Sequence, residues 1–536
     1  MDLELARPAP SPGPSPETEA PALAPAGRAL QDSRDGGTAP DAAPADRTIG
    51  TLVDGAYDLA GRDDAPAELT GLLDRALAAR AEIAGREPDP PSVDRAVGTI
   101  TERLDSSFTN PVTHGDLVAV QRTVEGLSPA EATRTFERLP EGLLDEWSDQ
   151  MNDRIGGYGR AEKSALFGAL AERLDGAQLA RFADALSSPP SGADGQRLGL
   201  QIASQAPAAV RVGFVREAAP LAGVDPEATL ALGEALGGLR GPDIDRALGT
   251  LSPDQLRSVV DGSVVTERYT AAMGGGGHLT IMHDAGTLGR LLDGLATSRD
   301  PSAKALAIGE AVERLEEIET RSGIGYAVSS GDGPSEVRDG ITAVLRSDAG
   351  GVVRALEQDA DPYGLAFTGY VKSMIQDGRS GDVGRLLVDL GTDGGTRAPS
   401  DWVTERAPGD HNGDTYYENA QTLGYAVGSV QAAIESITSD RRDQADAVKS
   451  IFGATVGVAG AAHPAGGAVG SVLTGLGNEA VDAVVDRYTS QDQTLSSTLR
   501  DLAFPRNPDG SRYNGPAETP HGEAALRVVS EHRGRR

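Results

Sequence analysis

Cysteine is absent from this chain of 536 residues, and aromatic residues are scarce. Without cysteine the chain can form no disulfide, thiolate zinc site, iron–sulfur cluster or cysteine nucleophile. Aromatic residues make up 4% of the sequence while hydrophobic residues of all types reach 39%, so we expect a core of aliphatic side chains. The length is sufficient for about two to four domains with a sizeable buried core.

Lysine is nearly missing, since it occurs only at Lys163, Lys304, Lys372 and Lys449. A GC-rich coding bias explains this scarcity most simply; selection against lysine modification inside a host cell and salt adaptation are the alternatives. Acidic residues outnumber basic ones by 80 to 49, which gives a formal net charge of −31. Because such a surface repels phosphate backbones, we expect no nucleic-acid partner. The charge favours solubility or a basic partner.

The sequence also lacks a secretory signal peptide and a strongly apolar run of about 18 residues. Residues 1–47 are rich in Pro, Ala, Ser and Asp, and we expect this segment to be disordered or locally polyproline II. It is either a passive tail or an uncleaved export signal for a specialised bacterial secretion machine. Export without a cleaved signal peptide, or alternatively a cytoplasmic location, is therefore expected.

Residues 48–400 predict an array of short amphipathic helices paired into hairpins. Ser128 and Ser252 each precede a proline and an acceptor side chain two residues beyond it, which is typical of a capped helix start. Asp225 and Asp300 also stand directly before proline. No residue recurs at a fixed period, so we expect an irregular solenoid-like array or a layered bundle. The fold class is all-α.

Two stretches interrupt the helical pattern. Residues 274–284 (GGGGHLTIMHD) predict a flexible loop or hinge, in which 279–282 form a short strand or a first helical turn. Residues 391–414 are rich in Gly, Asp, Pro and Thr and predict a domain boundary. We therefore expect a C-terminal helical domain at 401–490, followed by a polar tail at 491–536.

The stretch 451–478 contains no Asp, Glu, Lys or Arg, and its glycines recur at GxxxG spacing. Such spacing allows helix backbones to approach closely, either in a core or in a membrane. We expect a packing or membrane hairpin at 451–476 with two arms of about 12 residues, each about 18 Å long as a helix and shorter than a bilayer core. A buried helical hairpin is the first interpretation, and insertion into a membrane after a conformational change is the alternative. The hairpin residues are Gly453, Gly457, Gly460, Pro464, Gly466 and Gly470. A phosphate-binding loop at 475–480 lacks the required βαβ setting.

No motif in the sequence carries a strong catalytic or cofactor prediction. A metal-dependent hydrolase with a loop site at His278 and His283 is an alternative, but residues five apart share neither a helix face nor a strand face. Residues 410–414 begin like a calcium loop that then lacks the required glycine and glutamate, so we expect a polar turn. Carboxylate pairs such as Asp359 with Asp361 predict solvated faces. We expect no cofactor and no enzymatic activity.

Residues 419–430 (NAQTLGYAVGSV), with the following predicted helix and glycine-rich hairpin, resemble C-terminal regions of large bacterial secreted effectors and polymorphic-toxin-like proteins. Residues 143–186 are similar to helical regions of such proteins, and the two likenesses cover about a third of the chain. No toxin active-site motif accompanies them. The resemblance implies an exported bacterial protein directed at a host or a competitor.

The combined expectation is a non-enzymatic secreted effector, with a role in virulence, that binds a protein partner through helical surfaces. A secretion chaperone is a second expected partner, and association of residues 451–476 with a membrane is an additional alternative. A cytoplasmic scaffold or adaptor, in which the glycine-rich hairpin is ordinary core, is the runner-up function.

Overall fold

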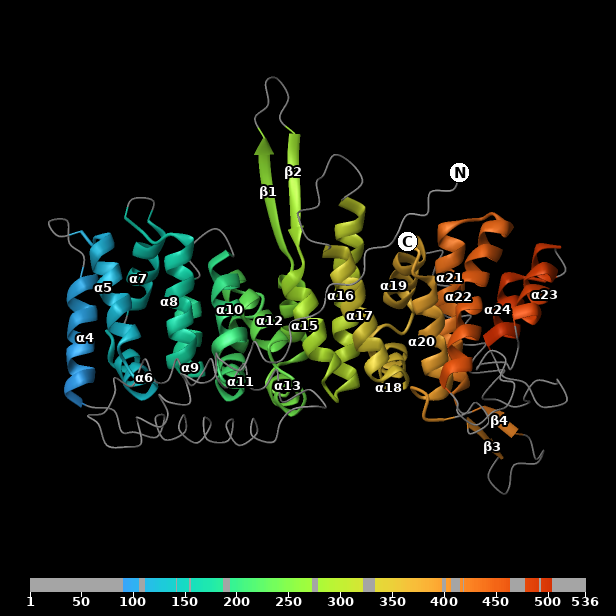
Figure 1. Cartoon of the computed structure of the whole chain (residues 1–536), viewed down its shortest axis with the longest axis horizontal. Helices are drawn as coiled ribbons and strands as arrows, with labels where there is room; N and C mark the ends of the chain where they lie inside the picture. Colours follow the sequence, from blue (N-terminus) through green and yellow to red (C-terminus); the bar gives the residue numbers. More distant parts are fainter. Residues whose placement is uncertain are drawn as a thin grey trace, which may run out of the picture. The chain divides into compact units, whose positions relative to one another are not determined.

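The computed structural model confirms the all-α fold class (Figure 1). It describes residues 90–105, 111–140, 142–153, 156–186, 193–271, 278–321, 333–397, 402–405, 415–417, 419–462, 478–490 and 493–503. This part of the chain contains 21 α-helices and two small two-stranded sheets. The expected N-terminal disorder at 1–47 and most of the expected tail at 491–536 lie outside the described residues.

The described residues form two compact units, of which the first comprises those between 90 and 162 together with 172–178. Within this unit α4 packs against α5, α6 and α7, and the rings of Phe136 and Trp147 lie 6.1 Å apart in its core. Both rings are fully buried. The helices with residues in this unit are α4 (Pro90–Leu104), α5 (His114–Glu125), α6 (Pro129–Arg138), α7 (Leu143–Asn152), α8 (Arg160–Arg173) and α9 (Gly176–Ala185), the last two shared with the second unit.

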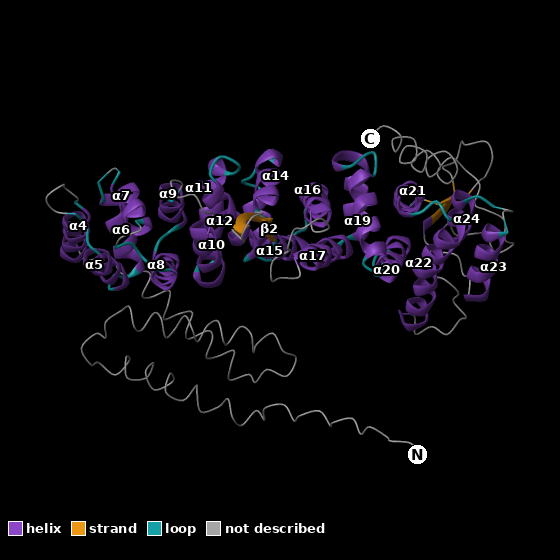
Figure 2. Ribbon diagram, turned by 90° about the horizontal axis from the view of Figure 1, so that it is seen from above, coloured by secondary structure: helices purple, strands orange, loops and turns teal. Residues whose placement is uncertain are grey.

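The second unit arranges its helices in two rows, and most helices pack on their neighbour within a row (Figure 2). One row contains α10 (Ala193–Gln205), α12 (Pro226–Gly237), α15 (Gly286–Ala296), α17 (Gly333–Ser347), α20 (Ser380–Thr392), α22 (Arg441–Ala462) and α23 (Asn478–Thr489). The other row contains α11 (Ala208–Ala218), α13 (Pro242–Leu248), α14 (Pro253–Gly262), α16 (Pro301–Arg321), α19 (Leu365–Gln376), α21 (Ala420–Ile437) and α24 (Leu495–Ala503). Three short elements complete it: η2 (Ala219–Leu221), α18 (Ala349–Ala355) and η3 (Leu356–Ala360). The expected irregular array of helical hairpins is therefore present.

The predicted helix starts are confirmed by hydrogen bonds. Ser128 and Ser252 each form a reciprocal capping box with the side chain at the third helical position. Asp225 caps α12, and the Asp300 carboxylate accepts from the backbone N–H of Ser302 at 2.9 Å. These caps satisfy amide groups that have no partner within the helix itself, and so they set where each helix begins.

Helix α12 is the most deeply buried element of the second unit. Every residue from Glu227 to Gly237 is buried, and the helix packs on α10, α11, α14 and α15. The approach of α10 requires a glycine, because a Cβ at Gly199 would lie 2.8 Å from the Ala231 Cα and 2.7 Å from the Glu234 Cβ. These two helices therefore touch almost backbone to backbone.

A buried charge joins α12 to α15. Glu234 is fully buried, and its carboxylate accepts hydrogen bonds from Arg290 Nε at 2.7 Å and from the Thr287 hydroxyl at 2.6 Å. The hydrogen bonds that Arg290 donates to Glu234 raise the pKa of Arg290. Removal of one partner would leave a buried charge uncompensated, so the pair holds the two helices in one register.

A second acidic pair lies at the start of α12. Asp225 and Glu227 are 4% and 2% exposed, and the Asp225 carboxylate accepts from the backbone N–H of Glu227 at 2.9 Å. Burial raises the pKa of both carboxyl groups, that of Glu227 to about 7, and the nearby Asp184 raises the pKa of Asp225 further. Because two adjacent buried carboxylates repel each other, the pair retains a proton near neutral pH.

Two of the four lysines are core residues. Lys163 Nζ lies 2.7 Å from an Asp194 carboxylate oxygen, and Lys304, which is 2% exposed, donates to the Ser347 hydroxyl at 2.8 Å. Burial lowers the pKa of both ammonium groups, that of Lys163 to about 8. The third, Lys449 of α22, pairs with Asp482 of α23 at 3.0 Å. Lys163 and Lys304 thus have structural roles within the second unit.

The predicted flexible loop at 274–284 is in part a β-strand. Strands β1 (Val265–Ala271) and β2 (His278–Asp284) form an antiparallel ladder from Val265↔Asp284 to Ala271↔His278. Figure 1 shows this hairpin extending past the ends of the neighbouring helices α12 and α15. The alternative that 279–282 form a strand is therefore confirmed, while residues 274–277 lie outside the described part.

The helices on the two sides of the predicted boundary at 391–414 pack directly against each other. Helix α20 contacts α22, and α19 contacts α21. The Trp402 indole N–H donates to the Gly391 carbonyl at 3.0 Å, and the Asn419 amide donates to the Leu390 carbonyl at 2.7 Å. A short pair of strands, β3 (Val403–Glu405) and β4 (Thr415–Tyr417), lies between these helices in the sequence. The helices of 401–490 therefore belong to the same compact unit as α19 and α20.

Gly199→Ala should destabilise the second unit by about 1–3 kcal/mol, because the new methyl group must displace backbone atoms of α12. Gly309→Ala in α16 is the matched control, since a Cβ there meets no atom within 4 Å and should stabilise the helix by about 0.5–1 kcal/mol. Urea unfolding followed by circular dichroism measures both. Equal effects of the two substitutions would contradict the close approach of α10 and α12.

Glu227→Gln should remove part of the pH dependence of stability. The folded-state pKa of about 7 lies above the ordinary value of 4.5, so the folded chain holds a proton that the unfolded chain releases between these two values. This stabilisation is complete below the unfolded pKa and is lost as the pH rises through the folded pKa. Between about pH 5 and about pH 8 the wild type should lose on the order of 2 kcal/mol more unfolding free energy than the variant. Identical losses of unfolding free energy in the wild type and the variant, measured by urea unfolding at the two pH values, would refute the raised pKa of Glu227.

Candidate functional site

The first predicted arm of the glycine-rich hairpin is part of a longer helix. Helix α22 runs unbroken from Arg441 to Ala462 and includes Gly453, Gly457 and Gly460, so the first expected arm of about 12 residues continues a helix that begins before the glycine-rich stretch. Its earlier turns are held in the core through Ala445, Val448, Ile451 and Phe452. A Cβ at Gly453 meets no atom within 4 Å, so this glycine makes no close helix contact.

The second half of the predicted hairpin, with Pro464, Gly466 and Gly470, lies outside the described residues. Its role in packing or in a membrane therefore stays a prediction. Among the helices of the described part, none combines the length and the apolar character needed to cross a bilayer.

The geometry of β2 contradicts a shared metal site at His278 and His283. These residues lie at opposite ends of one regular strand, His278 opposite Ala271 and His283 opposite Thr266. Five residues of strand separate them by about 17 Å, whereas one metal ion requires both ligands within about 2.1 Å of itself. His283 is 4% exposed and lies 3.0 Å through Nδ1 from the Thr266 hydroxyl. Residues 410–414 lie outside the described part.

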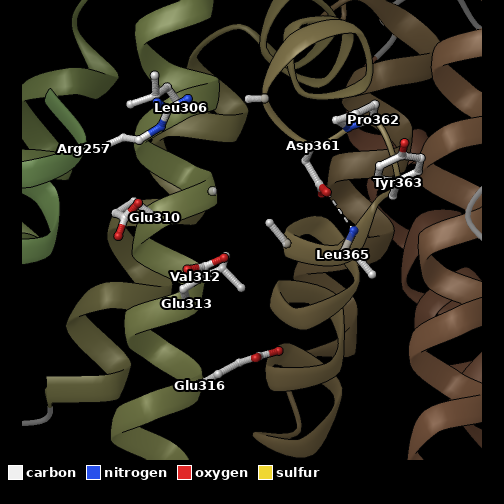
Figure 3. Close-up of a pocket in the computed structure, with 13 residues that line it drawn as sticks. Arg257, Leu306, Glu310, Val312, Glu313, Glu316, Asp361, Pro362, Tyr363 and Leu365 are labelled. Atoms are coloured by element: carbon white, nitrogen blue, oxygen red, sulfur yellow. Dashed lines mark hydrogen bonds between the residues drawn. The ribbon is translucent and has the colours of Figure 1, made fainter. Parts of the chain in front are cut away.

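The strongest candidate site is a groove in the second unit, between α16 and the turn that leads into α19 (Figure 3). Its volume is about 290 Å³, and Arg257 of α14 lines one end. The groove was not predicted from the sequence, because its two walls are about 50 residues apart and come together only when the helix rows form.

One wall of the groove is acidic. Glu310, Glu313 and Glu316 lie three residues apart on α16, so all three share one helix face. Figure 3 shows Glu316 extending toward the opposite wall. Within the described part of the chain, no ion pair or hydrogen bond neutralises any of these carboxylates. Burial and the adjacent Glu313 raise the pKa of Glu310, which is half-buried, while Arg257 acts in the opposite direction.

The opposite wall is apolar and partly exposed. Tyr363 is 46% exposed and Leu365 is 38% exposed, in a unit whose other large apolar side chains are almost all buried. Gly364 between them adopts a left-handed conformation with φ of +66°, which forms the turn into α19 without side-chain strain. An exposed tyrosine and leucine beside a groove are typical of a contact surface.

Asp361 holds this turn in place. Its carboxylate accepts from the backbone N–H of Leu365 at 2.8 Å, from that of Phe367 at 2.9 Å, and from the Tyr425 hydroxyl at 2.9 Å. Asp361 is only 6% exposed, so the prediction of a solvated face for this residue is wrong. Burial raises its pKa, and the hydrogen bonds from Phe367 and Tyr425 lower it. The carboxylate therefore serves the structure and leaves the groove to other side chains.

The turn follows an unusual helical segment. Helix α18 ends at Ala355 and continues as η3, a single π-helical turn. Such turns are rare and occur frequently at functional sites. Here the segment leads into the turn whose residues Tyr363 and Leu365 line the groove on the side opposite α16 (Figure 3).

No protein-family model, curated protein or solved structure matches the chain. The resemblance of residues 143–186 and 419–430 to bacterial secreted effectors therefore stays an expectation drawn from the sequence.

Asp361→Ala should destabilise the second unit by about 2–3 kcal/mol, because it leaves the amide groups of Leu365 and Phe367 without their acceptor and leaves the Tyr425 hydroxyl only the backbone carbonyl of residue 361. Tyr425→Phe should cost about 1 kcal/mol, and the double variant should be less destabilised than the sum of the two by about 1 kcal/mol. Asp359→Ala is the control, since Asp359 is exposed. Additive effects in urea unfolding would contradict the proposed network.

Proposed function

We propose that this chain is a non-enzymatic effector of the bacterial secreted class that acts by binding a partner protein through the groove between α16 and α19. The observation that carries the proposal is the pairing of unneutralised carboxylates with exposed Tyr363 and Leu365 across one groove. Most large apolar side chains of this unit are at least partly buried. A groove that sets exposed apolar side chains opposite carboxylates without an ion pair in the described part of the chain is suited to contact with another molecule.

The resemblance to bacterial secreted effectors supports export and a host or competitor target as part of this proposal. An uncleaved signal in residues 1–47 and a secretion chaperone belong to the same proposal. The cytoplasmic scaffold or adaptor uses the same groove and differs only in where the partner resides. Membrane association of residues 451–476 is an additional alternative within this proposal.

A photo-crosslinking side chain placed at Tyr363 should trap one discrete partner in cells that produce the full chain or are exposed to it. The same side chain at Leu200 is the matched control, because Leu200 is 36% exposed on α10, away from the groove. A specific adduct at Tyr363 and none at Leu200, detected by mass spectrometry, is the expected result. Equal adduct patterns at the two positions would reject the groove as the binding surface.

A further inference from the structure

The carboxylates of the groove form a row that can meet successive cationic groups. Glu310, Glu313 and Glu316 lie three residues apart on α16, so the row rises about 4.5 Å per step and about 9 Å in all. An amphipathic helical segment presents residues at the same three- to four-residue intervals. The acidic row therefore matches the spacing of basic side chains on one face of a partner helix.

The wall opposite the row suits the rest of a cationic side chain. Tyr363 and Leu365 offer apolar surface across the groove from the carboxylates. Arginine and lysine bury their methylene stems on apolar surface while the charged head meets an anion. A tyrosine face adds favourable stacking for a guanidinium group. Recognition of the whole cationic side chain requires both walls, because the carboxylates meet its charged head and the apolar wall meets its stem.

The groove differs in this respect from a second hollow in the described part of this unit, between α17 and α20. That hollow is lined by Asp339, Asp382 and Asp389, but each of these carboxylates already pairs with an arginine. Arg379 lies 2.7 Å from Asp339 and 3.0 Å from Asp382. Acidic residues there are neutralised within the chain, whereas those of the groove are left for a partner.

We propose, resting on the function proposed above, that the groove between α16 and α19 binds an arginine-bearing amphipathic helix of the partner protein. The guanidinium groups meet Glu313 and Glu316, and an apolar residue of the same helix packs on Leu365. The formal net charge of −31 attracts such a segment over a longer range and raises its association rate. The acidic row and the apolar wall of the groove then hold its cationic and apolar side chains.

The proposal is tested on the full chain with a fluorescein-labelled peptide of alanine, leucine and arginine, with an arginine at every third or fourth position. The same peptide with citrulline in place of arginine keeps the shape and removes the charge. The arginine peptide should bind at least about tenfold more tightly than the citrulline peptide in fluorescence anisotropy. Its affinity should fall as salt is added.

The double variant Glu313→Gln/Glu316→Gln should weaken binding of the arginine peptide at least about tenfold. Glu102→Gln/Asp105→Asn is the matched control, because it removes two exposed carboxylates outside the groove and should leave the affinity within about twofold of wild type. Equal losses in both double variants would show attraction by net charge alone and would overturn the proposal. Binding of the citrulline peptide as tightly as the arginine peptide would overturn it as well.

Failure of this inference is distinguishable from failure of the proposed function. If crosslinking at Tyr363 traps a partner while the arginine peptide shows no preference for the groove, the groove binds a partner of another chemistry. If neither experiment gives a groove-specific result, both proposals are wrong.

Discussion

The second unit depends on the burial of α12 along its whole length. The residues of this helix from Glu227 to Gly237 are all buried. Each of its polar groups therefore needs a hydrogen-bond partner, because a buried polar group without one lowers the free energy of unfolding. Glu234 meets this requirement through Arg290 and Thr287, and Asp225 meets it in part by capping the helix. The close approach at Gly199 brings α10 near enough to exclude water from these groups. Packing and charge neutralisation are therefore coupled in this helix.

Helix starts could be predicted from the sequence because their signals are local. Ser128, Ser252 and Asp225 each act within one turn of the helix they begin, and the structure forms the expected caps. The hairpin of β1 and β2 was harder to predict from the sequence, because the four glycines and the short apolar run at 274–282 are compatible with a loop as well as with a strand. The pairing of Thr266 with His283 depends on the partner strand, which a local pattern does not specify.

The groove could not be predicted from the sequence, because the role of each of its residues is set by contacts with residues far away in the chain. In the sequence Asp361 resembles many other acidic surface residues. Its structural role depends on Tyr425, 64 positions later, which donates a hydrogen bond to its carboxylate. Glu313 and Glu316 in turn look like the residues of any solvated helix face. What distinguishes them is the apolar wall across the groove, which comes from the turn before α19. In so acidic a chain, the sequence alone does not distinguish the few carboxylates that lie opposite an apolar wall from the many that face solvent.

In the described part of the chain, the arginines pair with carboxylates other than those of the groove. The chain has 49 basic residues for 80 acidic ones, so many carboxylates must be without a counterion. The described part assigns arginines to structural positions, such as Arg290 on Glu234 and Arg379 between Asp339 and Asp382. Unneutralised carboxylates on convex surface are solvated at little cost, but those facing an apolar wall lose part of their hydration, which raises the pKa of Glu310. A positively charged group in the groove would therefore offset the desolvation of Glu310 and also pair with the exposed carboxylates of Glu313 and Glu316.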